Sequence, residues 1–175
     1  MLLDGLTEAL RLVVSCDRAI LHAVAVSLLC SLMALALAAA VAIPWGAHLA
    51  LFRPRGHRLQ VFCLRVGMSI PTVALGLLVF SLLSRRGPLG DLDLLYSRGA
   101  IILGELLLAL PLLASLVHGA VAGLDPRVRE TLITLGVSRP RALLVALSEV
   151  RAALVAALLA TFGRCVTELG IAITV

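Results

Sequence analysis

The longest uncharged stretch of the sequence lies at residues 19–52 and reads AILHAVAVSLLCSLMALALAAAVAIPWGAHLALF. A helix that crosses a bilayer needs about 20 consecutive apolar residues, so this stretch is long enough to span one. It therefore predicts a transmembrane helix, and with it a membrane protein whose apolar surface faces lipid.

The composition favours the same class of protein. Of the 175 residues, 61% are hydrophobic and 14% are charged, and the mean hydropathy is +1.11. A soluble domain has roughly 45–50% apolar and about 25% charged residues. A compact domain of this length has too little interior to bury so much apolar surface, which excludes a soluble globular protein.

Charged and metal-binding residue types point to no nucleic-acid or metal site. All positive residues are arginines, scattered between apolar runs, and aromatic residues make up only 3% of the chain, so no basic face for nucleic acid is expected. The four cysteines form no CxxC pair and the four histidines no HExxH motif. We therefore predict no metal site, no cofactor and no catalytic residue.

Three more apolar segments follow the first. Residues 66–84 and 106–124 carry no charged residue, and Glu105 directly precedes the second of these segments. Residues 152–175 are interrupted only by Arg164 and Glu168. The sequence thus predicts an all-α, multi-pass transmembrane helical bundle with four spans. Apolar residues at helical spacing in residues 1–18 predict a short interfacial helix before a transmembrane domain of residues 19–175. Because the last apolar segment has no polar tail, we expect that domain to be C-terminally incomplete, with a final span missing.

Arginines cluster after the first and third spans. Arg53, Arg55 and Arg58 follow the first span, and the second cluster lies at residues 127–141. Cytoplasmic loops carry an excess of arginine, so we place both loops in the cytoplasm and the N-terminus outside.

The segment after the third span has residues that favour a helix with a defined start and end. Asp125 is a suitable N-cap, Pro126 suits the first helical position, and Gly136 suits the turn that ends a helix. Val128, Leu132 and a leucine at position 135 would share one apolar face. This pattern predicts a short amphipathic helix at the cytoplasmic surface, and a simple interfacial link between two spans remains the alternative.

The same segment resembles the EAA loop of permease subunits in ATP-binding-cassette (ABC) importers. In that loop, Glu-Ala-Ala is followed after three residues by Gly, as Glu130 is followed by Gly136 here. Thr131 and Leu132 replace the two alanines, and the Ile-x-Leu-Pro half of the motif is absent.

The resemblance extends in the same order over about residues 20–175, to the tungstate-type permeases of the MetI-like group. It rests on four further stretches: SIPTVALGLL at 69–78, LLSRRGPLG at 82–90, GE at 104–105 with ALP at 109–111, and FGR at 162–164 with TELG at 167–170.

This resemblance implies a permease in the inner membrane of a prokaryote that imports an oxyanion, with tungstate as the expected cargo. It further implies a homodimer, cytoplasmic ABC ATPase subunits that hydrolyse the ATP, and an extracytoplasmic oxyanion-binding protein. Residues 125–137 would form the coupling helix that docks on the ATPase, and its coupling residues would be Asp125, Arg127, Glu130, Thr131, Leu132 and Gly136. Molybdate, sulfate or another solute remains an alternative cargo, and an uncoupled channel or scaffold subunit an alternative function.

Charged residues and prolines inside the spans supply the candidate pathway. Arg164 and Glu168 are four residues apart and would either form an internal ion pair or place an arginine on the path of the anion. Arg65 and Glu105 are expected to snorkel to the membrane surface. Prolines and glycines in spans 2 and 3 predict hinges and close helix contacts beside a polar path. The pathway and hinge residues are Pro71, Gly76, Glu105, Pro111, Arg164 and Glu168.

Overall fold

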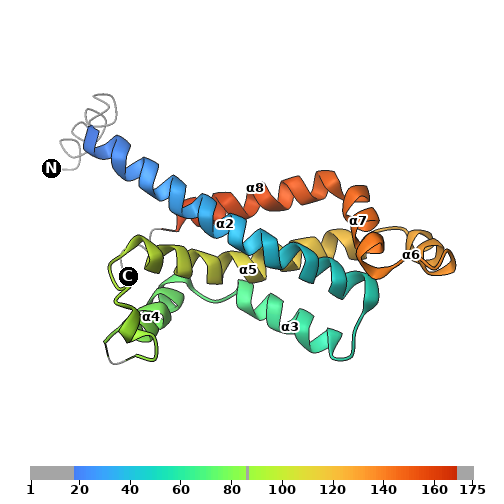
Figure 1. Ribbon diagram of the computed structural model, residues 1–175, viewed down its shortest axis with the longest axis horizontal. Coiled ribbons are helices and arrows are strands. Elements are labelled where there is room, and N and C mark those ends of the chain that lie inside the picture. The colour runs from blue at the N-terminus through green and yellow to red at the C-terminus, as the bar shows by residue number, and fades with distance from the viewer. Residues whose placement is uncertain (1–17, 86, 169–175) are drawn as a thin grey trace.

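The computed structural model describes residues 18–85 and 87–168, which form helices and no strand. The elements are α2 (Arg18–Phe52), α3 (His57–Met68), α4 (Thr72–Leu83), the 3-10 turn η1 (Gly90–Leu92), α5 (Arg98–Ala122), α6 (Pro126–Thr134), α7 (Arg139–Glu149) and α8 (Arg151–Thr167). Figure 1 shows α2 and α5 crossing along the middle, with α3 and α4 on one side and α7 and α8 on the other. The predicted all-α fold is confirmed.

Helices α2 and α5 form the most extensive helix pair of the fold. The contact is lined with small side chains: Ala34, Ala38 and Ala42 are fully buried on one face of α2, one turn apart. Gly46 continues that face, and a Cβ atom on it would lie 2.6 Å from the carbonyl oxygen of Ala114 in α5. Small residues let two helix backbones approach closely, which is how helices associate in a membrane without a hydrophobic driving force between them.

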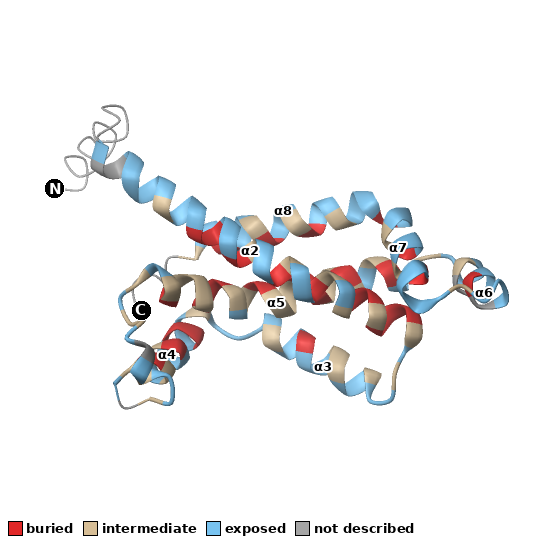
Figure 2. Cartoon of the chain, viewed as in Figure 1, coloured by how far each residue is buried: buried red, intermediate tan, exposed pale blue. Residues whose placement is uncertain are grey.

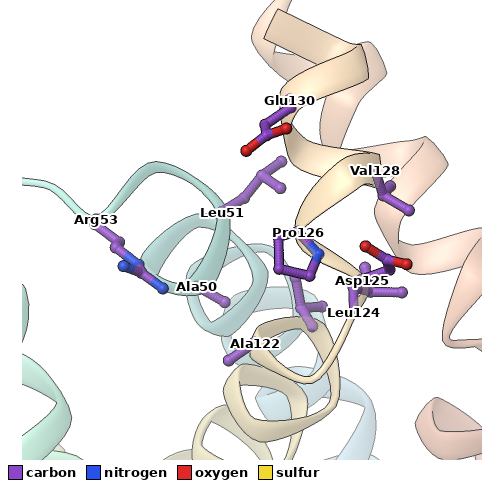
Figure 3. Close-up of a pocket in the computed structure, with 10 residues that line it drawn as sticks. Ala50, Leu51, Arg53, Ala122, Leu124, Asp125, Pro126, Val128 and Glu130 are labelled. Carbon is purple, nitrogen blue, oxygen red and sulfur yellow. The ribbon is translucent and has the colours of Figure 1, made fainter.

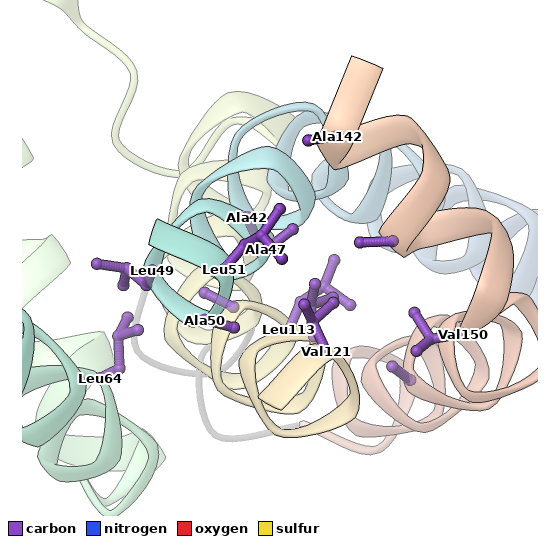
Figure 4. Close-up of a cluster of buried hydrophobic side chains, with 14 of the residues drawn as sticks. Ala42, Ala47, Leu49, Ala50, Leu51, Leu64, Leu113, Val121, Ala142 and Val150 are labelled. Atoms are coloured by element: carbon purple, nitrogen blue, oxygen red, sulfur yellow. The ribbon is translucent and has the colours of Figure 1, made fainter. Parts of the chain in front are cut away.

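The main apolar cluster lies where the second halves of α2 and α5 pack together, and Figure 4 shows its side chains. Leu49 of α2 and Leu113 of α5 are fully buried there. Leu64 joins them from α3, Ala142 from α7 and Val150 from the α7–α8 junction. Burial is concentrated on the facing sides of α2 and α5, whereas the outward face of α8 is exposed (Figure 2).

The predicted span 2, from Val66 to Ser84, is broken beside the predicted hinge residue Pro71. The chain forms α3 and α4 there, which are bent by 100° at the break between them and count as one crossing if the bent pair is a single span. Pro71 immediately precedes α4; it lacks an N–H and disfavours a helical conformation in the residue before it, which breaks the ladder of hydrogen bonds. With 12 residues, α4 is about 18 Å long and too short to cross a bilayer by itself.

The last described segment is also a bent pair. Helices α7 and α8 meet at Val150 with a bend of 79°, and α8 covers the described part of the predicted fourth span. Two helices, α2 and α5, are long and apolar enough to cross a membrane, and up to four crossings result if each bent pair counts as one. Spans 1 and 3 are therefore confirmed as membrane-spanning candidates.

The two arginine-rich loops lie at the same end of the molecule, as the orientation argument requires. The loop from α2 to α3 and the segment around α6 meet there (Figure 1), and the guanidinium carbon of Arg139 lies 5.6 Å from the ring centre of Phe52. The interfacial helix expected at 1–18 and the end of the predicted fourth span beyond Glu168 lie outside the described residues.

Candidate functional site

Helix α6 begins with the cap that the sequence predicts. The carboxylate oxygen Oδ1 of Asp125 accepts a hydrogen bond of 2.9 Å from the backbone N–H of Arg127. Pro126 occupies the first helical position, where its missing N–H costs no hydrogen bond. Two threonines bond back to the helix itself: Thr131 Oγ1 donates to the carbonyl of Arg127 at 2.7 Å, and Thr134 Oγ1 to that of Glu130 at 2.8 Å.

The C-terminus of α6 ends in a left-handed turn at Gly136, whose φ is +62°. The N–H of Val137 donates to the carbonyl of Leu132 at 3.2 Å across this turn, which is the pattern of a Schellman motif. Leu132 is buried, whereas Leu135 lies after the helix and is 71% exposed, so the predicted shared face does not include Leu135. The result is a short helix held at both ends.

A cavity of about 310 Å³ lies between α6 and the end of α2. Arg53 borders it from the residue after α2, and Glu130 borders it from α6, so the structure brings the two arginine-rich loops to one place (Figure 3). Glu130 itself is exposed. A partner protein that docks at this end would therefore meet Glu130, Arg53 and the first turn of α6 together.

A second cavity, of about 320 Å³, lies where α3 breaks into α4, next to α5 and α8. Its walls are largely apolar, and among the described residues that line it Arg164 is the single charged side chain. Pro111 of α5 and Gly67 of α3 also line it, and a Cβ atom on Gly67 would lie 3.0 Å from Cβ of Pro111. A guanidinium in an apolar cavity is suited to binding an anion, because the surrounding walls do not screen its charge.

Arg164 and Glu168 form the ion pair that their spacing suggested. The Nη2 atom of Arg164 lies 2.8 Å from Oε1 of Glu168, the residue that directly follows α8. The arginine side chain is 49% exposed and the glutamate side chain 10%. Arg164 is thus held by Glu168 while its side chain still borders the cavity.

The other predicted hinge residues occupy different positions. Pro71 lies at the α3–α4 break and is exposed, whereas Pro111 lies inside α5, which continues past it as one helix. Gly76 is buried on the face of α4 that packs against the bundle. The structure therefore brings Pro111 and Arg164 to one cavity and leaves Gly76 in a packing position.

The expectation that Glu105 snorkels to the surface is wrong. Helix α5 begins at Arg98, so Glu105 lies about two turns inside it and is 4% exposed. The hydroxyl of Ser31 in α2 donates a hydrogen bond of 3.1 Å to its Oε1 atom. No local sequence pattern indicates this contact, because the two residues are 74 positions apart in the chain.

Two further contacts between distant residues join α3 to its neighbours. The Nε2 atoms of His57 and His118 lie 3.4 Å apart, and Trp45 Nε1 donates to Gln60 Oε1 at 3.3 Å. No sequence pattern predicted either pair. Within the described parts of the chain, no group of three or more His, Cys, Asp or Glu side chains is placed to hold a metal ion.

Three curated proteins are similar to most of this chain. The tungstate uptake system permease protein TupB of Campylobacter jejuni is 32% identical over 172 residues, which is 98% of this chain and 72% of that protein. TupB of Peptoclostridium acidaminophilum is 34% identical over 167 residues, covering 95% and 73% of the two chains. A probable anion ABC transporter permease protein of Haloferax volcanii is 36% identical over 146 residues, covering 83% and 63%. No protein-family model matches the chain.

Proposed function

Because this chain belongs to the family of ABC transporter permeases that includes tungstate uptake permeases, we propose that it forms the membrane pathway of an ATP-driven oxyanion importer. The observation that carries this proposal is α6, a short helix capped at both ends at the end of the molecule where both arginine-rich loops lie (Figure 1).

The coupling role of α6 follows from its stiffness and its connections. Only residues 123–125 separate α6 from α5, and residues 135–138 separate it from α7. A flexible loop would absorb the displacement of an attached ATPase, whereas a capped helix passes it to the helices on either side. Docking of a cytoplasmic ABC ATPase on α6 would therefore move α5 and the α7–α8 pair. If the chain were an uncoupled channel subunit, the capped ends of α6 would have no function in transport.

The cargo in this proposal is an oxyanion, with tungstate as the first candidate. Arg164 supports an anion because it is the single charged group lining the apolar cavity beside the α3–α4 break. Its guanidinium presents a planar fork of N–H donors that matches oxyanion oxygens. Glu168 limits the strength of binding by competing for the same guanidinium, which favours release of the ion. Tungstate itself is supported by the names of two relatives, both tungstate uptake permeases.

The complete importer would contain two copies of this chain, two ATPase subunits and an extracytoplasmic oxyanion-binding protein in the inner membrane of a prokaryote. The exposed leucines and valines along α2 would face lipid in this assembly.

Uptake into vesicles tests the cargo. The permease, its ATPase and its binding protein are reconstituted together, and ATP-dependent uptake of labelled tungstate, molybdate and sulfate is measured in parallel. ATP-dependent accumulation of tungstate supports the proposal in full. Accumulation of molybdate or sulfate in its place keeps the importer and replaces the cargo, whereas uptake that is independent of ATP contradicts the importer.

A further inference from the structure

A third cavity, of about 350 Å³, lies at the end of the molecule away from α6. It is formed by the start of α2, the start of α5 and the end of α8, and it does not include the Arg164 side chain. Its charged or titratable lining residues are His22, Arg98, Glu105 and Glu168, beside the thiols of Cys30 and Cys165.

Glu105 gives this cavity an unused hydrogen-bond acceptor. Only 4% of the residue is exposed, and its Oε1 atom already accepts the hydrogen bond from Ser31. The other oxygen, Oε2, is buried and has no hydrogen-bond partner within the described residues. A buried acceptor without a donor destabilises the fold, so a ligand that draws the Glu105 side chain toward the cavity and supplies that donor would bind favourably.

The charges around the cavity favour a cation over an anion. Glu105, Glu168 and Arg98 are its charged residues; since Glu168 is paired with Arg164, the balance lies between the buried carboxylate of Glu105 and the exposed guanidinium of Arg98. Glu168 is also paired with Arg164, whose side chain borders the neighbouring cavity. The buried carboxylate of Glu105 is therefore the charge that favours a cation in this cavity.

The other residues that line the cavity indicate which kind of cation it would bind. No group of three or more metal-ligating side chains exists in the described residues, so the cation is held by hydrogen bonds and charge. Ala23, Val26, Ile101 and Val166 add apolar surface, and Ser27 adds a hydroxyl. An ammonium group on a short carbon chain matches all of these features, since it combines N–H donors, a positive charge and an apolar part.

We propose that this cavity binds a primary ammonium ion, with its N–H groups directed to Glu105 and its carbon chain against the apolar wall. The ammonium could belong to a free small amine or to the ethanolamine headgroup of a phospholipid, because both present the same chemistry. The proposal does not depend on the cargo of the importer or on ATPase coupling.

Charged thiol reagents test the predicted preference. In the full chain with its four cysteines replaced by alanine, Ser27→Cys places a thiol in the cavity wall, and Ser81→Cys, exposed on α4, is the control. At each position, the rate of modification by the ethylammonium methanethiosulfonate is divided by the rate with the ethylsulfonate reagent. We expect this ratio to be about tenfold higher at position 27 than at position 81. Glu105→Gln should remove most of this excess, and Glu149→Gln, distant on α7, should leave it unchanged. Equal ratios at both positions, or an excess that Glu105→Gln leaves intact, would overturn the proposal.

A protection experiment avoids any effect of Glu105→Gln on folding. The thiol introduced by Ser27→Cys is modified in detergent with ethylammonium chloride or with sodium chloride at equal concentration, and in nanodiscs of phosphatidylethanolamine or phosphatidylcholine. Slower modification with ethylammonium identifies a free amine as the ligand. Slower modification only in phosphatidylethanolamine identifies the lipid headgroup, because the choline group has no N–H donor. Equal rates in both comparisons would overturn the proposal.

Discussion

The α2–α5 pair and the two bent pairs, α3–α4 and α7–α8, have opposite characters. Each helix of the first pair is continuous, although α2 contains Pro44 and α5 contains Pro111. In the bent pairs the chain turns by 100° and 79°. Among the predicted charged residues, Arg164 lies on a bent pair and Glu130 on the helix that leads into one, whereas Glu105 lies on α5 of the straight pair. The straight pair is therefore the framework of the described structure, and the bent pairs pack around it.

Prolines show why the chain breaks between α3 and α4 but not within α5. Pro111 lies against Gly67 and within a helix that has neighbours along much of its length, so its freed backbone groups are enclosed by protein. Pro71 is exposed and follows Ser69 and Ile70, both also exposed. A proline thus leaves a helix intact where packing supports both sides and breaks it where packing is absent.

The largest expected effect comes from a substitution in the α2–α5 contact. Gly46→Ala would bring a Cβ atom within 2.6 Å of the Ala114 carbonyl oxygen, and the backbone must shift to relieve that contact. We expect a loss of about 1–3 kcal/mol or more in unfolding free energy and little folded protein. Gly119→Ala on α5 is the control, because its Cβ would meet nothing within 4 Å. Equal thermal unfolding midpoints of the two variants would contradict the close contact.

The next effect concerns the cavity at the α3–α4 break. Arg164→Gln removes the single charge in its lining, so we expect ATP-dependent oxyanion uptake to fall about tenfold or more. Basal ATP hydrolysis should persist, because α6 is untouched. Arg151→Gln, exposed at the start of α8, should transport normally. Normal uptake by Arg164→Gln would remove this cavity from the pathway.

A smaller effect is expected at the end of α6. Gly136→Val places a β-branched residue at φ +62°, a conformation that costs roughly 1–2 kcal/mol, while leaving ample space for the side chain. The helix end should fray, and the uptake obtained per ATP hydrolysed should fall severalfold while membrane insertion is retained. Gly123→Ala, with an ordinary backbone conformation, should stay coupled. A Gly136→Val transporter with normal coupling would show that the left-handed turn is dispensable.

The smallest effect tests how firmly α3 is attached to the straight pair. Gln60→Ala removes the hydrogen bond from Trp45, which should cost about 0.5–1.5 kcal/mol in a thermal unfolding measurement. Arg58→Gln, exposed on the same helix, serves as the comparison and should be close to neutral. If Gln60→Ala is also neutral, the attachment of α3 depends on its other contacts.

Local features were predictable from the sequence, whereas contacts between helices were not. The apolar stretch at 19–52 and the signals Asp125, Pro126 and Gly136 act within a few residues, so α2 and the ends of α6 were anticipated. The bend at Val150 was not predictable, because no proline or glycine lies beside it. The burial of Glu105 and its bond to Ser31 depend on how α2 packs on α5, which no local pattern specifies.

Stimulation of ATP hydrolysis tests the coupling role of α6 most directly. The chain is purified with its ATPase, and hydrolysis is measured with and without the oxyanion-loaded binding protein, for the native chain, for Glu130→Arg on α6 and for Glu149→Arg on α7. We predict stimulation by the loaded binding protein in the native chain and in Glu149→Arg, and its loss in Glu130→Arg although the protein still inserts into the membrane. Equal stimulation of all three proteins would contradict the coupling role of α6.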